Sequence, residues 1–367
     1  MSKNTNIQEA ENIFNQAIEN TNDILYKTMP NPLNETLNKP LNDNITTNVL
    51  GKPHNFQHLS KFPSFQDLEN NKQKMLMKKI DDTLKKGKIE KWLIEFNELT
   101  IKYPHMAKGS NSFIHECEWR DTTIVVKKPN YKKLSCLTNL LKEIEIWSTL
   151  RYPGLVQFLG VSFDQSQDEF YIMMEKINGV NLKDFINDRT KSLSSIKKHY
   201  ICKNIINAVK FLHTCNPPII YRDLKPENIM IDRHSIIKLT DFGLSRFMPE
   251  TDKYNLTGET GTIRYMAPEV YLNKHYDLKV DVYSLGLILY FVYTGEIPFR
   301  EYDNHTIQTY FEKEDLLFST KPVSNKNIRF IINMCIQKNP SMRWDIHKLF
   351  TEFNKINVET NSGCEVS

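Results

Sequence analysis

Two polar segments, each set between short apolar runs, constrain this 367-residue chain more than any other feature. The first is IIYRDLKPENIMI, in which Asp223, Lys225 and Asn228 lie within six residues. The second is LTDFGLS, whose Asp241 follows Asn228 by thirteen residues. Short apolar runs of this kind are typical of strands, so the polar segments are expected to be turns that flank strands.

These four side chains form the set that phosphoryl transfer requires. A carboxylate must orient the attacking hydroxyl and accept its proton, and oxygen ligands must hold Mg²⁺ on the triphosphate. A cation must also offset the charge on the moving phosphoryl group. The structural alternative, two polar turns with no chemical role, explains either segment alone far better than it explains both in this order.

The composition is that of a soluble globular protein, with 40% apolar and 25% charged residues. The six cysteines show no metal-like spacing, so we expect reduced thiols. A net charge of +4 gives no reason to expect nucleic acid as a partner. The start, MSKNTNIQEA, lacks the apolar core of a secretory signal, and the apolar run LGLILYFVY is too short to cross a bilayer. We therefore expect a buried helix at residues 285–293 and a cytoplasmic protein.

Residues 1–70 are rich in Asn, Thr and Lys and are interrupted by prolines. Such a segment cannot bury enough apolar surface to offset its ordering entropy, so we expect it to be disordered. One stretch with near-helical apolar spacing predicts a transient helix or, alternatively, a docking helix for a partner: Ile13, Phe14, Ala17, Ile18, Ile24 and Leu25.

Residues 71–91 are rich in lysine, with Leu76, Ile80 and Leu84 spaced four apart on one helical face. We interpret this segment as a basic helical linker, solvated and leading into the next domain. The alternative is an amphipathic helix that meets an acidic membrane or partner.

The pattern changes from Trp92 onward. Short strand-like runs come first, and longer helical patterns such as SIKKHYICKNIINAVKFLHTC follow. This order predicts an α+β arrangement in two lobes. The folded part is expected to end near Phe353, which leaves residues 354–367 as a flexible tail.

Residues 92–353 resemble a eukaryotic protein kinase domain along their whole length, and most closely the serine/threonine kinases of the tyrosine kinase-like group. WLIEFNELTI looks like the lead-in of that group, and TGETGTIRYMAPEV looks like the end of its activation segment. The resemblance implies a bilobal fold, with a small antiparallel β-rich N-lobe that carries one key helix and a larger, mainly α C-lobe. It also implies ATP- and Mg²⁺-dependent phosphorylation of Ser/Thr hydroxyls on protein substrates, in signalling.

The resemblance assigns a role to each candidate site residue. Asp223 matches the catalytic base, Lys225 the lysine near the γ-phosphate, and Lys127 the strand lysine that binds the α- and β-phosphates and pairs with Glu143. Asn228 and Asp241 match the metal ligands. The expected nucleotide-binding set is Ala107, Gly109, Ser112, Ile114, Val125, Lys127, Met174, Glu175 and Met230.

The resemblance also implies structural contacts. Glu269 is expected to pair with Arg343, and Asp281 to anchor the catalytic loop. Tyr221 stands where most of the family has histidine, and it is expected to form an aromatic stack that links the lobes, together with Trp147, Phe158 and Phe242.

Arg222 is retained, and in the family this arginine meets a phosphorylated activation segment, which implies an upstream activating kinase. Thr257 and Thr260 are the better candidates for that phosphate, ahead of Tyr254. Lys225 and Thr262 together favour serine/threonine over tyrosine specificity.

The expected phosphate clamp, MAKGSNSFIHECEW, keeps only Gly109 of the three glycines that the family carries, with Ala107 and Ser112 at the other two positions. Val125 stands where most kinases have alanine over the adenine. We interpret the clamp as weakened but working, because the ionic residues are intact. The alternative is a pseudokinase, a signalling scaffold with weak or no transfer activity.

The last four residues, CEVS, fit the pattern for prenylation at Cys364. A flexible tail with a chance cysteine is the favoured interpretation. The alternative is a farnesylated protein held at the periphery of a membrane, with the lysine-rich residues 72–91 as its second attachment signal.

Overall fold

The computed structural model describes most of the chain from Asn70 onward, and all of the described residues lie in one compact unit, residues 56–367. The expectations for residues 1–69, Gly109, Tyr254, Thr257, Thr260, Thr262 and Cys364 fall outside the described residues. The described ranges are 70–108, 112–129, 134–164, 166, 169–188, 190, 193–248, 263–313 and 318–357.

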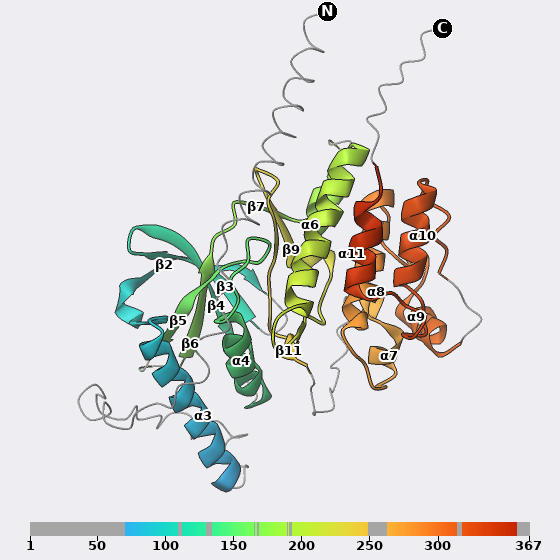
Figure 1. Ribbon diagram of the computed structural model, residues 1–367. Helices are drawn as coiled ribbons and strands as arrows, with labels where there is room; N and C mark the ends of the chain where they lie inside the picture. The colour runs from blue at the N-terminus through green and yellow to red at the C-terminus, as the bar shows by residue number, and fades with distance from the viewer. Residues whose placement is uncertain are drawn as a thin grey trace, which may run out of the picture. The chain divides into compact units, whose positions relative to one another are not determined.

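A six-stranded sheet forms the first part of the fold, with the strand order β1-β5-β6-β4-β3-β2 (Figure 1). Neighbouring strands are antiparallel except for the short β1, which pairs in parallel with β5. The strands are β1 (Leu93–Ile94), β2 (Leu99–Lys108), β3 (Ser112–Trp119), β4 (Thr122–Pro129), β5 (Phe158–Asp164) and β6 (Glu169–Glu175).

A tight hairpin sets the register of β3 against β4. Trp119 pairs with Thr122, so the loop consists of Arg120 and Asp121 alone. Both loop residues have positive φ, 48° and 60°, which is the backbone of a two-residue turn that matches the twist of the strands. The register that follows places Lys127 opposite Ile114.

Two helices accompany this sheet, α4 (Leu134–Trp147) and α3 (Asn70–Ile89) (Figure 1). A 3₁₀ turn, η2 (Phe96–Glu98), follows β1. The apolar residues of α4 recur at helical spacing and are buried at 0–4% exposure: Leu137, Leu140, Leu141 and Ile144. The sequence led us to expect a solvated helix at residues 71–91, but one face of α3 is buried. Its face of Leu76, Ile80 and Leu84 is buried in the same hydrophobic core as α4.

The second part of the fold is mainly helical, with two small sheets of order β10-β9-β7 and β11-β8. The helices are α5 (Leu182–Asn187), α6 (Ser195–His213), α7 (Pro268–Tyr271), α8 (Lys279–Thr294), α9 (Asn304–Glu312), α10 (Lys326–Cys335) and α11 (Ile346–Asn354). The strands are β7 (Gly179–Asn181), β8 (Ile219–Ile220), β9 (Ile229–Asp232), β10 (Ile237–Leu239) and β11 (Arg246–Phe247), and the 3₁₀ turns are η3 (Pro226–Asn228) and η4 (Ile263–Tyr265).

Helix α8 is the centre of this second part, because every residue from Val280 to Val292 is buried. The apolar run at 285–293 is therefore part of a buried helix, as predicted. At Gly286 an added Cβ would come within 2.6 Å of the Cβ of Cys335, so glycine allows α10 to approach closely. No helix in the described part of the chain is both long enough and apolar enough to span a bilayer.

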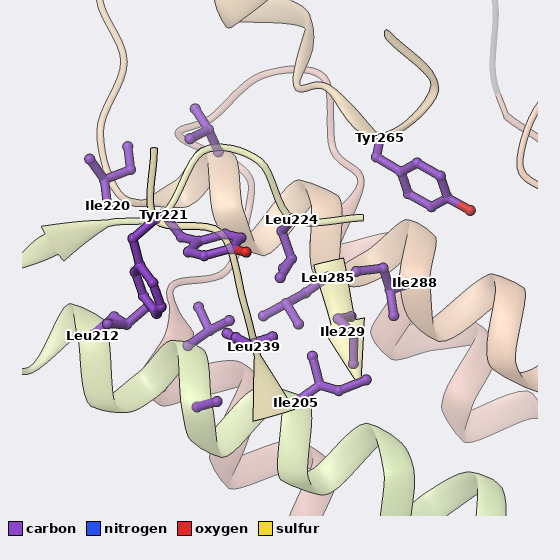
Figure 2. Packing of buried hydrophobic residues seen from close by; sticks show 14 of the residues in the cluster. Ile205, Leu212, Ile220, Tyr221, Leu224, Ile229, Leu239, Tyr265, Leu285 and Ile288 are labelled. Atoms are coloured by element: carbon purple, nitrogen blue, oxygen red, sulfur yellow. The ribbon is translucent and has the colours of Figure 1, made fainter. Parts of the chain in front are cut away.

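A core packed against α6 and α8 supports the polar turns (Figure 2). Side chains from the two helices pack against apolar side chains in and next to the polar turns. The helical residues are Ile205, Leu212, Leu285 and Ile288, and those of the turns and their flanking strands are Ile220, Leu224, Ile229 and Leu239. The predicted α+β architecture in two lobes is thus confirmed: a six-stranded sheet accompanied by α3 and α4, followed by a mainly helical part.

Candidate active site

Lys127 is the point at which three elements meet. It lies on β4, and its Nζ is 2.7 Å from Oε1 of Glu143 on α4 and 2.8 Å from Oδ1 of Asp241, which follows β10. The side chains of Lys127 and Glu143 are only 11% and 4% exposed. The structure therefore brings together a buried cation and two carboxylates from distant parts of the sequence.

Lys127 and Asp241 stabilise each other's charge against the cost of burial, whereas burial raises the pKa of Glu143 in spite of Lys127. Burial acts to lower the pKa of Lys127, but the carboxylates of Asp241 and Glu143 outweigh it and raise that pKa above its usual range. Partial burial likewise opposes ionisation of Asp241, whose side chain is 45% exposed, but Lys127 outweighs it and lowers the pKa of that carboxyl. Lys127 is consequently a cation and Asp241 an anion at neutral pH.

Asp223 forms a second cluster with Lys225 and Asn228. The Nζ of Lys225 donates to both carboxylate oxygens of Asp223, at 2.9 and 3.1 Å. The Nδ2 of Asn228 donates to Oδ2 of Asp223 at 2.8 Å and to its backbone oxygen at 2.9 Å. Burial raises the pKa of Asp223 in spite of Lys225. The cluster thus holds a carboxylate of increased basicity in one orientation.

Asp281 anchors the backbone before this cluster, as predicted. It lies in the first turn of α8, is fully buried, and accepts hydrogen bonds at 2.8 Å from the backbone N–H groups of Tyr221 and Arg222. It also contacts Nε2 of His213 at 2.9 Å. The turn that carries Asp223 is thus attached to a helix that is buried from Val280 to Val292.

Two residues of the site have left-handed backbone conformations, Arg222 with φ 70° and Asp241 with φ 64°. The Nε of Arg222 donates to the backbone oxygen of Leu244 at 2.6 Å, and its Nη1 donates to the hydroxyl of Tyr276 at 2.9 Å. Tyr276 was not predicted as a partner of Arg222, since no spacing pattern links two residues 54 positions apart.

The predicted aromatic stack is present. The ring centroids of Trp147 and Phe158 are 5.9 Å apart, those of Trp147 and Phe242 are 5.3 Å apart, and those of Phe242 and Tyr221 are 5.6 Å apart. The rings therefore connect α4 and β5 to the two polar turns. Separations of this size are typical of favourable aromatic contacts.

The predicted ion pair between Glu269 and Arg343 is also present. Arg343 donates to both carboxylate oxygens of Glu269, at 2.6 and 3.1 Å, and both residues are buried. A bidentate ion pair of this kind fixes the relative orientation of the two side chains and also contributes energy. It holds α7, the short helix at the end of the activation segment, against the segment before α11.

The expected nucleotide-binding residues lie on neighbouring strands. Val125 on β4 is half-buried and faces Met174 on β6, while Ile114 and Ser112 are half-buried on β3. The backbone of Ala107 pairs with that of Ile114. Met230 is half-buried on β9.

Glu175 ends β6, and its carboxylate accepts hydrogen bonds from Nζ of Lys238 at 2.5 Å and from the backbone of Gln157 at 2.7 Å. Contacts of Glu175 with a nucleotide are therefore left to its backbone. Lys238 was not predicted, since nothing in the sequence pairs it with Glu175.

The oxygen donors fit a magnesium ion. The Nδ2 of Asn228 is occupied by Asp223, so the opposite end of its amide, Oδ1, is an acceptor. The Oδ1 atom of Asp241 accepts the hydrogen bond from Lys127, and the side chain of Asp241 is 45% exposed. A backbone hydrogen bond of 3.0 Å from Thr240 to Asn228 joins the two segments. Magnesium prefers one or two such protein oxygens together with substrate phosphates and water.

No group of three or more His, Cys, Asp or Glu residues that could hold a metal occurs in the described part of the chain.

The profile of the protein kinase domain, Pkinase, matches residues 102–353. The chain belongs to the protein kinase domain family. The resemblance inferred from the sequence is thereby confirmed.

Serine/threonine kinases, including members of the tyrosine kinase-like group, are among the relatives of this protein kinase domain. The serine/threonine-protein kinase VIK of Arabidopsis thaliana is 34% identical over 221 residues, which are 58% of this chain and 50% of VIK. The probable serine/threonine-protein kinase drkC of Dictyostelium discoideum is 30% identical over 254 residues, 68% of this chain and 34% of drkC.

The serine/threonine-protein kinase TNNI3K of Mus musculus is 32% identical over 212 residues, 56% of this chain and 24% of TNNI3K. The chain therefore spans half or less of the length of these relatives. In the kinase domain described here, the ionic residues that the sequence singled out form two clusters, one around Lys127 and one around Asp223.

Proposed function

We propose that this protein kinase domain, residues 92–353, transfers the γ-phosphoryl group of ATP to serine or threonine hydroxyls of proteins and uses Mg²⁺. The observation that carries the proposal is the contact of Lys127 with both Glu143 and Asp241. Burying a cation between two carboxylates carries a desolvation cost that their attraction need not repay, so a function would explain why these charges are kept. A protein that needed only the shape of the fold would have little reason to keep these charges.

The cluster around Asp223 performs the proton transfer in this proposal. The carboxylate takes the proton of the acceptor hydroxyl as that oxygen attacks the γ-phosphorus. Lys225 and Asn228 hold the carboxylate in one orientation. The raised pKa of Asp223 makes it a stronger base than an exposed aspartate. Lys225, 2.9 Å away, offsets the negative charge that moves with the phosphoryl group.

The cluster around Lys127 positions the nucleotide. Lys127 binds the α- and β-phosphates, and Glu143 keeps its ammonium group in place. Asn228 and Asp241 would hold the magnesium, which shields the charge of the phosphate oxygens when it is bound. The strand residues around Val125 and Met174 would form the adenine site.

Serine/threonine specificity is the finer part of the proposal. It rests on Lys225, on Thr262 in the sequence, and on relatives named as serine/threonine kinases. An upstream activating kinase is part of the same proposal, through Arg222.

The direct test is to incubate the purified full chain with labelled ATP, Mg²⁺ and a generic basic protein substrate. We expect labelled phosphoserine and phosphothreonine, and no phosphotyrosine. The Asp223→Asn variant, prepared in the same way, is the control, because it retains the shape and size of the side chain.

The competing function is a pseudokinase scaffold. Val125 favours it, since its side chain packs against the core beside the expected adenine site, where a bulky group crowds a ligand. Equal labelling by the wild type and Asp223→Asn would support the scaffold. In that case nucleotide binding without transfer would be the expected behaviour.

A further inference from the structure

Helix α3 lies upstream of the residues that match the kinase family, which begin at 102, yet it is part of the kinase core. Leu76, Ile80 and Leu84 occupy one face of the helix and are 7%, 0% and 2% exposed. The helix packs against α4 and β1, and Figure 1 shows α3 beside α4. The helix that carries Glu143 is thus covered by a segment from outside the matched domain.

Apolar packing holds α3 in place. The one ion pair between the helices that is seen among the described residues joins Lys79 to Glu145 at 3.6 Å, with side chains 42% and 52% exposed. Exposed pairs of this kind contribute little to stability. The burial of three aliphatic side chains is the larger effect. The contact is therefore a hydrophobic one, and salt should have little influence on it.

The end of α3 is fitted closely to Trp92. An added Cβ at Gly87 would lie 2.6 Å from Cζ3 and 2.8 Å from Cε3 of the Trp92 ring, and the backbone N–H of Trp92 donates to the oxygen of Gly87 at 2.9 Å. Trp92 is 5% exposed. The close approach fixes where the ring can lie.

Trp92 extends the aromatic stack of the site. Its ring centroid is 5.8 Å from that of Phe158, edge to face, and Phe158 is the ring that contacts Trp147 on α4. The end of α3 is therefore connected through successive ring contacts to Phe242 and Tyr221 in the polar turns.

The helix α4 has to lie in one place for the ion pair to form. Leu140 and Ile144, on either side of Glu143 in the sequence, are 2% and 0% exposed. Removal of the cover over α4 would expose apolar surface and loosen the helix, and Glu143 would no longer be held 2.7 Å from Lys127.

We propose that α3 and Trp92 are a positioning element of the active site: they hold α4 where Glu143 binds Lys127, so residues 70–92 set the rate of phosphoryl transfer. The effect on the rate depends on the proposed kinase activity, whereas the effect on α4 does not. Neither α3 nor Trp92 touches the reacting atoms, so both act through Glu143.

The test uses the full chain and three matched substitutions. Ile80→Ala removes buried atoms from the contact between α3 and α4. Met75→Ala changes the same helix at a side chain that is 73% exposed, and Ile332→Ala removes the same atoms from a fully buried position on α10. Amide hydrogen exchange of residues 134–147, steady-state kinetics with MgATP and the melting temperature are measured for each variant.

We expect Ile80→Ala to speed exchange in α4 by about tenfold or more and to lower kcat/KM for ATP by about tenfold. Met75→Ala should change neither quantity. Ile332→Ala should lower the melting temperature to a similar extent as Ile80→Ala but leave exchange in α4 and kcat/KM as in the wild type. If Ile80→Ala matched Met75→Ala in both readouts, the proposal would be overturned.

Two further variants keep the test decisive. Ile80→Val removes a single methylene and serves where Ile80→Ala does not fold; it should shift both readouts in the same direction by a smaller factor. Gly87→Ala adds an atom against the Trp92 ring and should also speed exchange in α4. If the wild type showed no transfer activity, the proposed kinase function would be wrong. The positioning role of α3 would then be tested by hydrogen exchange in α4 alone.

Discussion

The guanidinium of Arg222 donates a hydrogen bond of 2.9 Å to the hydroxyl of Tyr276, across 54 residues of sequence. A second bond, from Nε to the backbone oxygen of Leu244, ties the same arginine to the segment after Phe242. Tyr276 therefore holds the side chain that the family uses to meet an activation-segment phosphate.

Tyr276→Phe removes this hydroxyl and keeps the ring. A hydrogen bond to a charged group contributes roughly 1.5–3 kcal/mol, so we expect the free energy of unfolding to fall by about that amount. Urea denaturation measures it, with Tyr302→Phe, a change at an exposed ring, as the control. Equal stability of the two variants would show that the bond contributes nothing.

Phosphorylation of Thr257 or Thr260 should place a phosphate within reach of Arg222 and raise activity through charge-assisted hydrogen bonds. Mass spectrometry of the active protein tests whether these residues are modified. Arg222→Ala should then remove the difference in rate between phosphorylated and unphosphorylated protein. An active protein with an unmodified segment would exclude this route of activation.

Lys127→Met and Asp241→Asn each remove one charge from the cluster around Lys127. The loss of one preorganised electrostatic group typically lowers a rate by about 10²–10³-fold, and we expect such a decrease in transfer. Labelled-ATP assays measure it. If wild type and both variants gave the same signal, the activity would belong to a contaminant.

The activity should depend on pH through Asp223. Burial raises the pKa of this carboxyl, and only its ionised form can accept a proton. We therefore expect kcat/KM to fall as the pH decreases through that raised pKa, starting at a higher pH than for an ordinary aspartate of pKa about 3.9.

Protonation of Asp223 should have the opposite effect on folding. A carboxyl whose pKa is raised in the folded state contributes most stability below its unfolded pKa and loses that contribution as the pH rises through the folded pKa. The acid loss of activity therefore should not coincide with unfolding caused by this group. Asp223→Asn, expected to lower the rate by about 10²–10⁴-fold, should lack this acid limb. An unchanged limb in that variant would assign the pH dependence to another residue.

Val125→Ala should tighten binding of MgATP, alone or together with Ala107→Gly and Ser112→Gly. Relief of crowding by about 1.4 kcal/mol would strengthen binding tenfold. Calorimetry measures the affinity, with Thr123→Ala, an exposed change on the same strand, as the control. Unchanged or weaker affinity would show that the valine is accommodated by its surroundings.

The ionic site was predictable because its residues lie in short sequence motifs. Asp223, Lys225 and Asn228 lie within six residues, and the structure joins them within hydrogen-bond distance. The partner of Arg222 was not predictable, since Tyr276 carries no motif and meets the arginine only through tertiary packing.

The apolar face of α3 illustrates a related limit. The spacing of Leu76, Ile80 and Leu84 indicated a helix with one apolar face, but a periodic pattern does not name what covers that face. The hairpin at Arg120 and Asp121 was not predicted either: aspartate tolerates positive φ, but arginine is unusual there, and the pair lacks the glycine of common two-residue turns.

The left-handed backbones of Arg222 and Asp241 have an evolutionary consequence. Each conformation costs roughly 1–3 kcal/mol and persists because its surroundings impose it. Glycine would adopt these angles without steric conflict, but it would remove the side chains that the site uses. Selection for heat resistance and selection for activity should therefore favour different residues at these two positions, and a more thermostable descendant would be expected to gain its stability elsewhere.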